Sequence, residues 1–97
     1  MDIDEILKSV SAIIAHELGS SYRLFLFGSR AKGRYDEKSD IDIGIISDTR
    51  ITGKQMATIQ DKIVEIPTLL KIDLVDFNQV DDDFKKIALK HTRDIHK

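Results

Sequence analysis

The chain has 97 residues, a hydrophobic fraction of 41%, a charged fraction of 33% and a formal net charge of −2. These values are typical of a soluble globular protein, and the length predicts a single domain over residues 1–97. The slight negative charge provides no basic field to hold a nucleic-acid backbone, so we expect no direct nucleic-acid partner. Since the chain contains no cysteine, disulfides, thiolate metal sites and cysteine nucleophiles are excluded.

The sequence carries no signal for membrane insertion or secretion. No apolar run approaches the about 18 residues that a membrane-spanning helix needs. The N-terminus is acidic, unlike a signal peptide. We therefore expect a cytoplasmic protein without a membrane partner.

The first third of the chain predicts a long helix, a buried strand and a short helix. Asp2 and Glu5 have the spacing of a capping box, and Gly19 is a natural helix end. Residues 22–27 are mostly aromatic or aliphatic, as in a strand buried on both faces. A short helix is expected to begin at or just after Ser29. The long helix has one apolar stripe at helical spacing, formed by Ile3, Ile6, Leu7, Val10, Ile13, Ile14 and Leu18.

The middle of the chain predicts two strands that flank a helix. After a polar loop over residues 35–39, apolar residues alternate with polar ones over residues 40–46, as in a strand. Thr52 opens a helix that ends before Pro67. Residues 71–77 form a third alternating strand. The apolar face expected for the helix consists of Met56, Ile59, Ile63 and Ile66.

The C-terminal segment predicts a last helix, capped by Asp81 or Asp82. Its inner face would consist of Phe84, Ile87, Ala88, His91 and Ile95, and the polar tail from Lys90 onward would fray. The order helix, strand, short helix, strand, helix, strand, helix predicts an α/β fold. In this fold a small mixed β-sheet is covered by helices.

Asp40 and Asp42 are a candidate metal site. Side chains at positions i and i+2 of a strand lie on the same face, about 7 Å apart. At that distance two carboxylates repel by about 2 kcal/mol in an effective dielectric of about 20. If the third strand pairs beside the second, Asp73 joins them, and three carboxylates suit Mg²⁺. From spacing alone, the solvated face of an edge strand explains the pair equally well.

The glycines at positions 28 and 33 have the spacing of a phosphate-binding loop, but its two chemical positions are wrong. Arg34 stands where that loop has lysine, and Tyr35 stands where it has a hydroxyl ligand for the metal. A calcium loop built on Asp40 and Asp42 fails too, because Gly44 is one place early and no glutamate follows.

Gly28, Ser29 and Arg30 remain as candidate nucleotide-binding residues. Gly28 lets the backbone approach a ligand closely, and Ser29 supplies a hydroxyl and an amide at a turn. Arg30 is one of three nearby cations, with Lys32 and Arg34, each of which is more often simply solvated. Ser29 has little support as a nucleophile, because no histidine lies near it in the sequence.

The string Gly28-Ser29, ten residues, Asp40-x-Asp42 resembles the signature of the nucleotidyltransferase superfamily that includes DNA polymerase beta. It is most similar to the minimal nucleotidyltransferase (MNT) proteins, over about residues 22–77. The resemblance implies that Asp40 and Asp42 bind the catalytic Mg²⁺ ions. Asp73 would be the third carboxylate, and ATP the nucleotide donor. Asp76 is out of phase with Asp73 and is expected to be structural or exposed.

The resemblance also implies a partner and a reaction. Minimal nucleotidyltransferases typically act with a helical HEPN-type toxin, as the antitoxin of a toxin–antitoxin pair. This chain would then transfer AMP from ATP to a hydroxyl of that toxin, tyrosine being the expected acceptor. Two alternatives are a binding module that neutralises the partner or senses nucleotide without turnover, and an enzyme that modifies a small molecule such as an aminoglycoside. The latter has less support, because no second domain shapes an acceptor pocket.

Overall fold

The computed structural model describes residues 1–19 and 21–95. Within them, four strands form one mixed sheet in the order β3-β2-β1-β4. β2 pairs with β3 in parallel, whereas β1 pairs antiparallel with both β2 and β4. The strands are β1 (Tyr22–Phe27), β2 (Ile41–Ser47), β3 (Ile72–Asp76) and β4 (Arg93–Asp94). The mixed sheet and its helices confirm the predicted α/β class.

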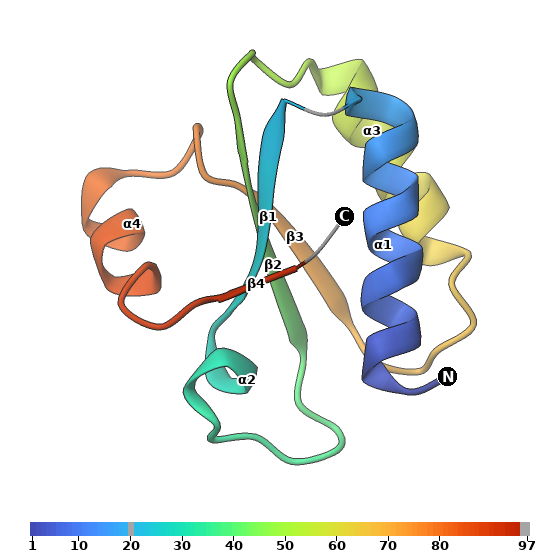
Figure 1. Ribbon diagram of the computed structural model, residues 1–97, viewed down its shortest axis with the longest axis vertical. Helices are drawn as coiled ribbons and strands as arrows, with labels where there is room; N and C mark the ends of the chain where they lie inside the picture. Colours follow the sequence, from blue (N-terminus) through green and yellow to red (C-terminus); the bar gives the residue numbers. More distant parts are fainter. Residues whose placement is uncertain (20, 96–97) are drawn as a thin grey trace.

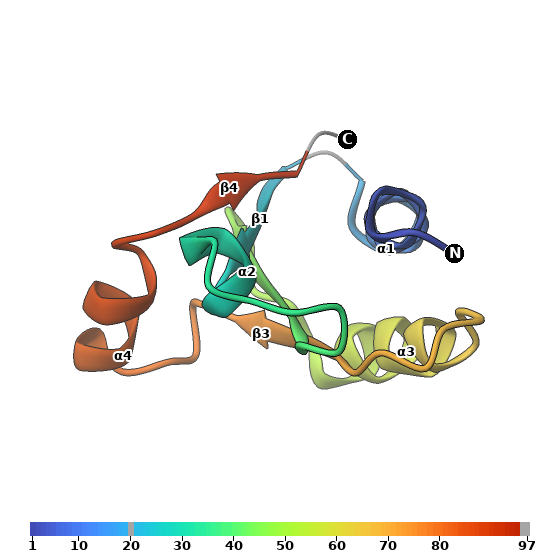
Figure 2. The same ribbon diagram turned by 90° about the horizontal axis from the view of Figure 1, so that it is seen from below.

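The helices lie on both faces of the sheet (Figure 1). Two long helices, α1 (Ile3–Leu18) and α3 (Gly53–Val64), cover one face. The short helix α4 (Asp82–Ala88) lies on the opposite face, and α2 (Ser29–Lys32) follows directly after β1. Figure 2 shows the same separation from below, with α4 and α3 at opposite sides of the strands. No helix in the described part of the chain is long and apolar enough to cross a membrane.

Both long helices begin as their sequences predict. The Asp2 side chain accepts a hydrogen bond from the Glu5 backbone N–H at 2.9 Å, and Glu5 Oε1 accepts one from the Asp2 N–H. Thr52 and Gln55 make the same reciprocal pair at the start of α3. Each box satisfies backbone N–H groups that have no partner inside the helix. Gly19 ends α1 with φ +78°, as expected for a glycine stop.

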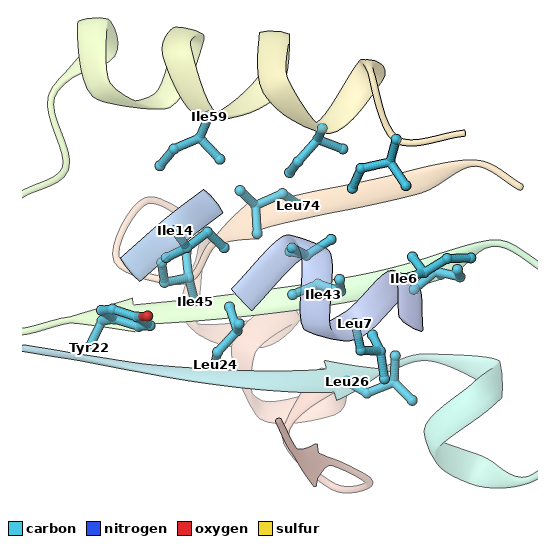
Figure 3. Close-up of a cluster of buried hydrophobic side chains, with 14 of the residues drawn as sticks. Ile6, Leu7, Ile14, Tyr22, Leu24, Leu26, Ile43, Ile45, Ile59 and Leu74 are labelled. Carbon is cyan, nitrogen blue, oxygen red and sulfur yellow. The ribbon is translucent and has the colours of Figure 1, made fainter. Parts of the chain in front are cut away.

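The main core lies between α1, α3 and one face of the sheet (Figure 3). Alternate residues of β1 and β2 point into it, because successive side chains of a strand lie on opposite faces. The predicted stripe of α1 is confirmed, since its side chains pack here. The fully buried side chains are Ile6, Val10, Ile14, Leu24, Leu26, Ile41, Ile43, Ile45 and Ile59.

A second, aromatic cluster lies on the opposite face of the sheet. Phe25, Phe27 and Phe77 are its buried members. The ring centroids of Phe25 and Phe77 are 4.9 Å apart and those of Phe27 and Phe77 are 5.2 Å apart, both in edge-to-face geometry. The rings of Phe25 and Phe77 fill the space beside Gly44, where a Cβ atom would overlap Phe25. Gly44 therefore lets the aromatic rings pack directly onto the backbone of β2.

The prediction for the last helix is wrong after Ala88. α4 ends there and carries no buried residue, and His91 lies outside it and is exposed. The chain turns back and pairs with the free edge of β1, where the Ile95 N–H donates to the Leu24 carbonyl at 2.9 Å. An exposed ion pair between Arg23 and Asp94, at 2.9 Å, accompanies this pairing.

The predicted fraying of the tail is therefore wrong for Arg93–Asp94, which form β4. Ile95 packs against the main core instead of lying on a helix face. Residues 96–97 lie outside the described residues.

Candidate active site

Gly28 connects β1 to α2 in a backbone conformation that only glycine adopts readily. Its φ of +74° and ψ of −154° lie in a region closed to other residues. A Cβ atom at this position would overlap Oδ2 of Asp42. The Gly28–Ser29 turn therefore lies directly against the carboxylate of β2, although ten residues separate Ser29 from Asp40 in the chain.

The register of the sheet brings Asp42 and Asp73 together. They are Cα partners in the parallel β2–β3 pair, and Phe27 is the partner of Asp42 in β1. Facing residues of neighbouring strands lie on the same side of a sheet, about 5 Å apart. The third strand therefore pairs beside the second, as the prediction for Asp73 required. The row Asp73, Asp42, Phe27 crosses three strands on the face opposite the main core.

Asp40 and Asp76 are placed differently. Asp40 lies just before β2 and is exposed, so the strand begins one residue later than predicted. It is two residues from Asp42 and thus approaches the same face. Asp76 pairs with Ile45, which is buried in the main core face, and its carboxylate accepts from the Asn78 backbone N–H at 3.0 Å. The predicted difference in phase between Asp73 and Asp76 is correct.

The electrostatics of this face are unfavourable for a carboxylate without a cation. Partial burial raises the pKa of Asp42, and the negative charges of Asp73 and Asp40 raise that pKa further. Lys71 opposes this shift, and its Nζ lies 3.7 Å from Oδ1 of Asp73. Among the described residues, no three acidic, histidine or cysteine side chains are already gathered as a metal cluster. The three carboxylates thus supply hard oxygen donors and a negative field, which suit Mg²⁺. Their side chains would have to turn toward one another to bind a single ion.

Arg30 makes contacts that the sequence did not indicate. Its Nη2 donates to the Ser39 carbonyl at 3.0 Å and to the Glu37 carbonyl at 3.4 Å, and its Nε also donates to Ser39. The guanidinium lies over the ring of Tyr35, 5.0 Å from its centroid. Arg30 therefore fastens the loop that ends at Asp40 to the helix that follows Gly28. Its predicted contact with phosphate stays a prediction.

The fold and this site define an α/β protein with a glycine–serine turn set against a group of carboxylates. The family described as "Polymerase beta, Nucleotidyltransferase" matches residues 3–97. A protein of Methanocaldococcus jannaschii, provisionally named a protein adenylyltransferase, is 38% identical over 77 residues, which are 75% of this chain and 69% of that protein. The chain therefore belongs to the polymerase beta nucleotidyltransferase family.

Two solved structures share the fold. One is a toxin–antitoxin complex with AMP-PNP. The match has a TM-score of 0.74 and 17% identity, and it covers 93% of this chain and 72% of the chain in that structure. The other is a tri-AMPylated HEPN toxin of Shewanella oneidensis in complex with an MNT antitoxin. This match has a TM-score of 0.72 and 14% identity, and it covers 97% of this chain and 72% of the chain in that structure. At these identities the likeness supports the fold alone.

Proposed function

We propose that this chain is a protein adenylyltransferase that acts as the antitoxin of a HEPN/MNT toxin–antitoxin pair. The family supplies the reaction class, and the related protein of Methanocaldococcus jannaschii supplies the name of the activity. The solved relatives contain a toxin partner, AMP-PNP in one case and an AMPylated toxin in the other. ATP is accordingly the donor, and a hydroxyl of the toxin is the acceptor.

The observation that carries the proposal is the contact of the Gly28 turn with Asp42 and the pairing of Asp42 with Asp73. Phosphates held at the Gly28–Ser29 turn lie within reach of both carboxylates. Asp40 and Asp42 hold the divalent ions, and Asp73 completes the ligand set from β3. The raised pKa of Asp42 supports this assignment, because a cation would relieve the burial and repulsion that cause the shift.

In the proposed reaction the acceptor oxygen attacks the α-phosphorus of ATP, the bond to the β-phosphate breaks, and pyrophosphate leaves. Bound Mg²⁺ supplies positive charge that lowers the pKa of the attacking hydroxyl and neutralises the phosphate oxygens. Asp73, on the β3 side of Asp42, orients the acceptor hydroxyl and helps it lose its proton. The turn of Gly28 and Ser29 orients the phosphates. Arg30 holds the loop before Asp40, and a contact of its remaining donors with the nucleotide phosphates is part of the proposal.

The test incubates the protein with its HEPN partner, Mg²⁺ and ATP labelled at the α-phosphate. We expect label on the toxin with the wild-type chain and none above background with Asp42→Asn. Mass spectrometry should locate one or more added AMP groups on a toxin hydroxyl. Equal labelling by both proteins would show that transfer does not depend on Asp42 and would overturn the assigned site. No labelling by either protein, while the toxin is still neutralised, would instead indicate a binding module without turnover.

A further inference from the structure

A small cavity adjoins the candidate active site on its β1 side. Its volume is about 200 Å³, and its lining residues are Phe27, Gly28, Lys32, Phe84, Ile87 and Ala88. Pockets that enclose a whole drug-sized ligand are larger, about 300–1,000 Å³. This cavity therefore has room for one planar group of a ligand whose remainder lies outside it.

The cavity has a preorganised aromatic wall. Phe84 contacts Phe27 edge-to-face at 6.2 Å between centroids and Phe77 at 5.8 Å. Both of these partners belong to the buried aromatic cluster, so the position of the Phe84 ring is set by packing. Even so, 41% of Phe84 and 62% of Ile87 remain exposed. Two large apolar side chains are thus held at a concave surface where a ligand can cover them.

The row of residues across the sheet shows on which side of the candidate active site this cavity lies. Asp73, Asp42 and Phe27 are successive Cα partners on β3, β2 and β1, spaced by about 5 Å per strand. An acceptor oriented by Asp73 approaches from the β3 side. In-line displacement places the leaving pyrophosphate opposite the acceptor, toward the Gly28–Ser29 turn, and leaves the nucleoside to one side of that axis. The cavity adjoins the turn on the β1 side, and its lining is apolar apart from Lys32, which suits a base and not a phosphate.

We propose that this cavity, walled by Phe84 and Ile87 of α4, binds the base of the nucleotide whose phosphates lie at the Gly28–Ser29 turn. This assignment rests on the proposed function. Every base offers a flat apolar face to the ring of Phe84, a contact that tolerates different bases. Lys32 at the rim supplies donors for ring nitrogen or carbonyl acceptors. α4 is therefore the element that recognises the nucleoside, and the two aspartate-bearing strands carry the chemistry.

The test compares two ligands by titration calorimetry in Mg²⁺ at 25 °C, ATP and inorganic tripolyphosphate, which lacks the nucleoside. We expect Phe84→Ala to raise the Kd for ATP about tenfold, within the roughly 5- to 150-fold range of one base–aromatic contact. Its Kd for tripolyphosphate should stay within about twofold of wild type. Ile87→Ala leaves the aromatic contacts intact and should weaken ATP binding by a smaller factor. Leu69→Ala, at a fully exposed apolar side chain outside the cavity, should change neither value.

Three outcomes would overturn the assignment. They are ATP binding unchanged in Phe84→Ala, equal weakening of ATP and tripolyphosphate, and loss of toxin binding with normal ATP affinity. The last would assign this surface to the toxin. The proposed function fails separately, if the wild-type chain transfers no AMP to the toxin. A selective loss of ATP affinity in Phe84→Ala would still support the base site in that case.

Discussion

One face of the sheet packs against α1 and α3 and is almost entirely aliphatic, whereas the other carries three carboxylates beside a small aromatic cluster. The same strands build both faces, because their side chains alternate. β3 shows the contrast within one strand: Asp73 lies beside Asp42, and Asp76 lies on the face of Ile45. The aliphatic face supplies most of the apolar burial. This burial offsets the repulsion between the carboxylates on the opposite face, which by itself destabilises the fold.

The largest expected effect separates the two aspartates of β3. Asp73→Asn should lower the rate of AMP transfer about 10²- to 10⁴-fold, the usual contribution of a group that assists proton transfer. Asp76→Asn should stay within about threefold of wild type, because its amide oxygen can still accept from the Asn78 N–H. Rates of label transfer to the toxin at saturating ATP measure both. Similar losses in the two variants would contradict the assignment of Asp73 to the site.

A second comparison uses two glycines with nearly the same positive φ. Gly28 has φ +74° and contacts Asp42, whereas Gly19 has φ +78° and open space around the Cβ position. Alanine at either should destabilise the fold by about 1–3 kcal/mol through backbone strain. Only Gly28→Ala should also displace the carboxylate or the turn, and a displacement of about 1 Å can lower the rate about 100-fold. Denaturant unfolding and transfer rates measure the two effects separately.

The smallest effect concerns the stability of the metal-free protein. Because the folded-state pKa of Asp42 is raised, its contribution to stability is present at low pH and is lost as the pH rises through that pKa. Asp42→Asn should therefore melt higher than wild type at pH 7. The rise should be small, because Asp42 is only partly buried, and each 1 kcal/mol corresponds to about 4–8 °C in a domain of this size.

Scanning calorimetry in a chelator measures this difference. It should shrink as the pH falls through the raised pKa of Asp42 and vanish below about 4, the ordinary value of an unfolded aspartate. Mg²⁺ should stabilise the wild type more than Asp42→Asn and so reduce the difference at pH 7. A variant that melts below wild type at pH 7 in the chelator would contradict this account.

Local chemistry made several elements predictable from the sequence. The capping boxes at Asp2 and Thr52 are patterns within four residues, and the stripe of α1 is a repeat within one helix. The turn at Gly28 was indicated by its residue type, and the structure adds its positive φ. The candidate site residues Asp40, Asp42 and Asp73 were predicted partly from strand phase and partly from the resemblance. Their place in one parallel pair depended on the sheet order, which no local pattern encodes.

The failures have a common physical cause. The apolar spacing of Ile87, His91 and Ile95 continues past the end of α4, but the edge of β1 offered pairing that a local reading could not weigh. Arg30 was named as one of three possible phosphate cations, which stays a prediction, but its bonds to Ser39 were not foreseen because they depend on the path of an irregular loop. Long-range pairing and loop geometry determine both results.

The two-residue strand β4 has a mechanical consequence. β3 and β4 are the two edges of the sheet, so the connection between them must cross its full width, about 14 Å for three strand spacings. That connection contains α4 and packs, through Val80, Ala88 and Leu89, against the aromatic cluster on the same face of the sheet as the carboxylates. Its β4 fastening is the shortest ladder in the described sheet. Displacing α4 from this face therefore requires release of its apolar contacts as well as the β4 pairing, and Ile95, which follows β4, links that pairing to the edge of the main core.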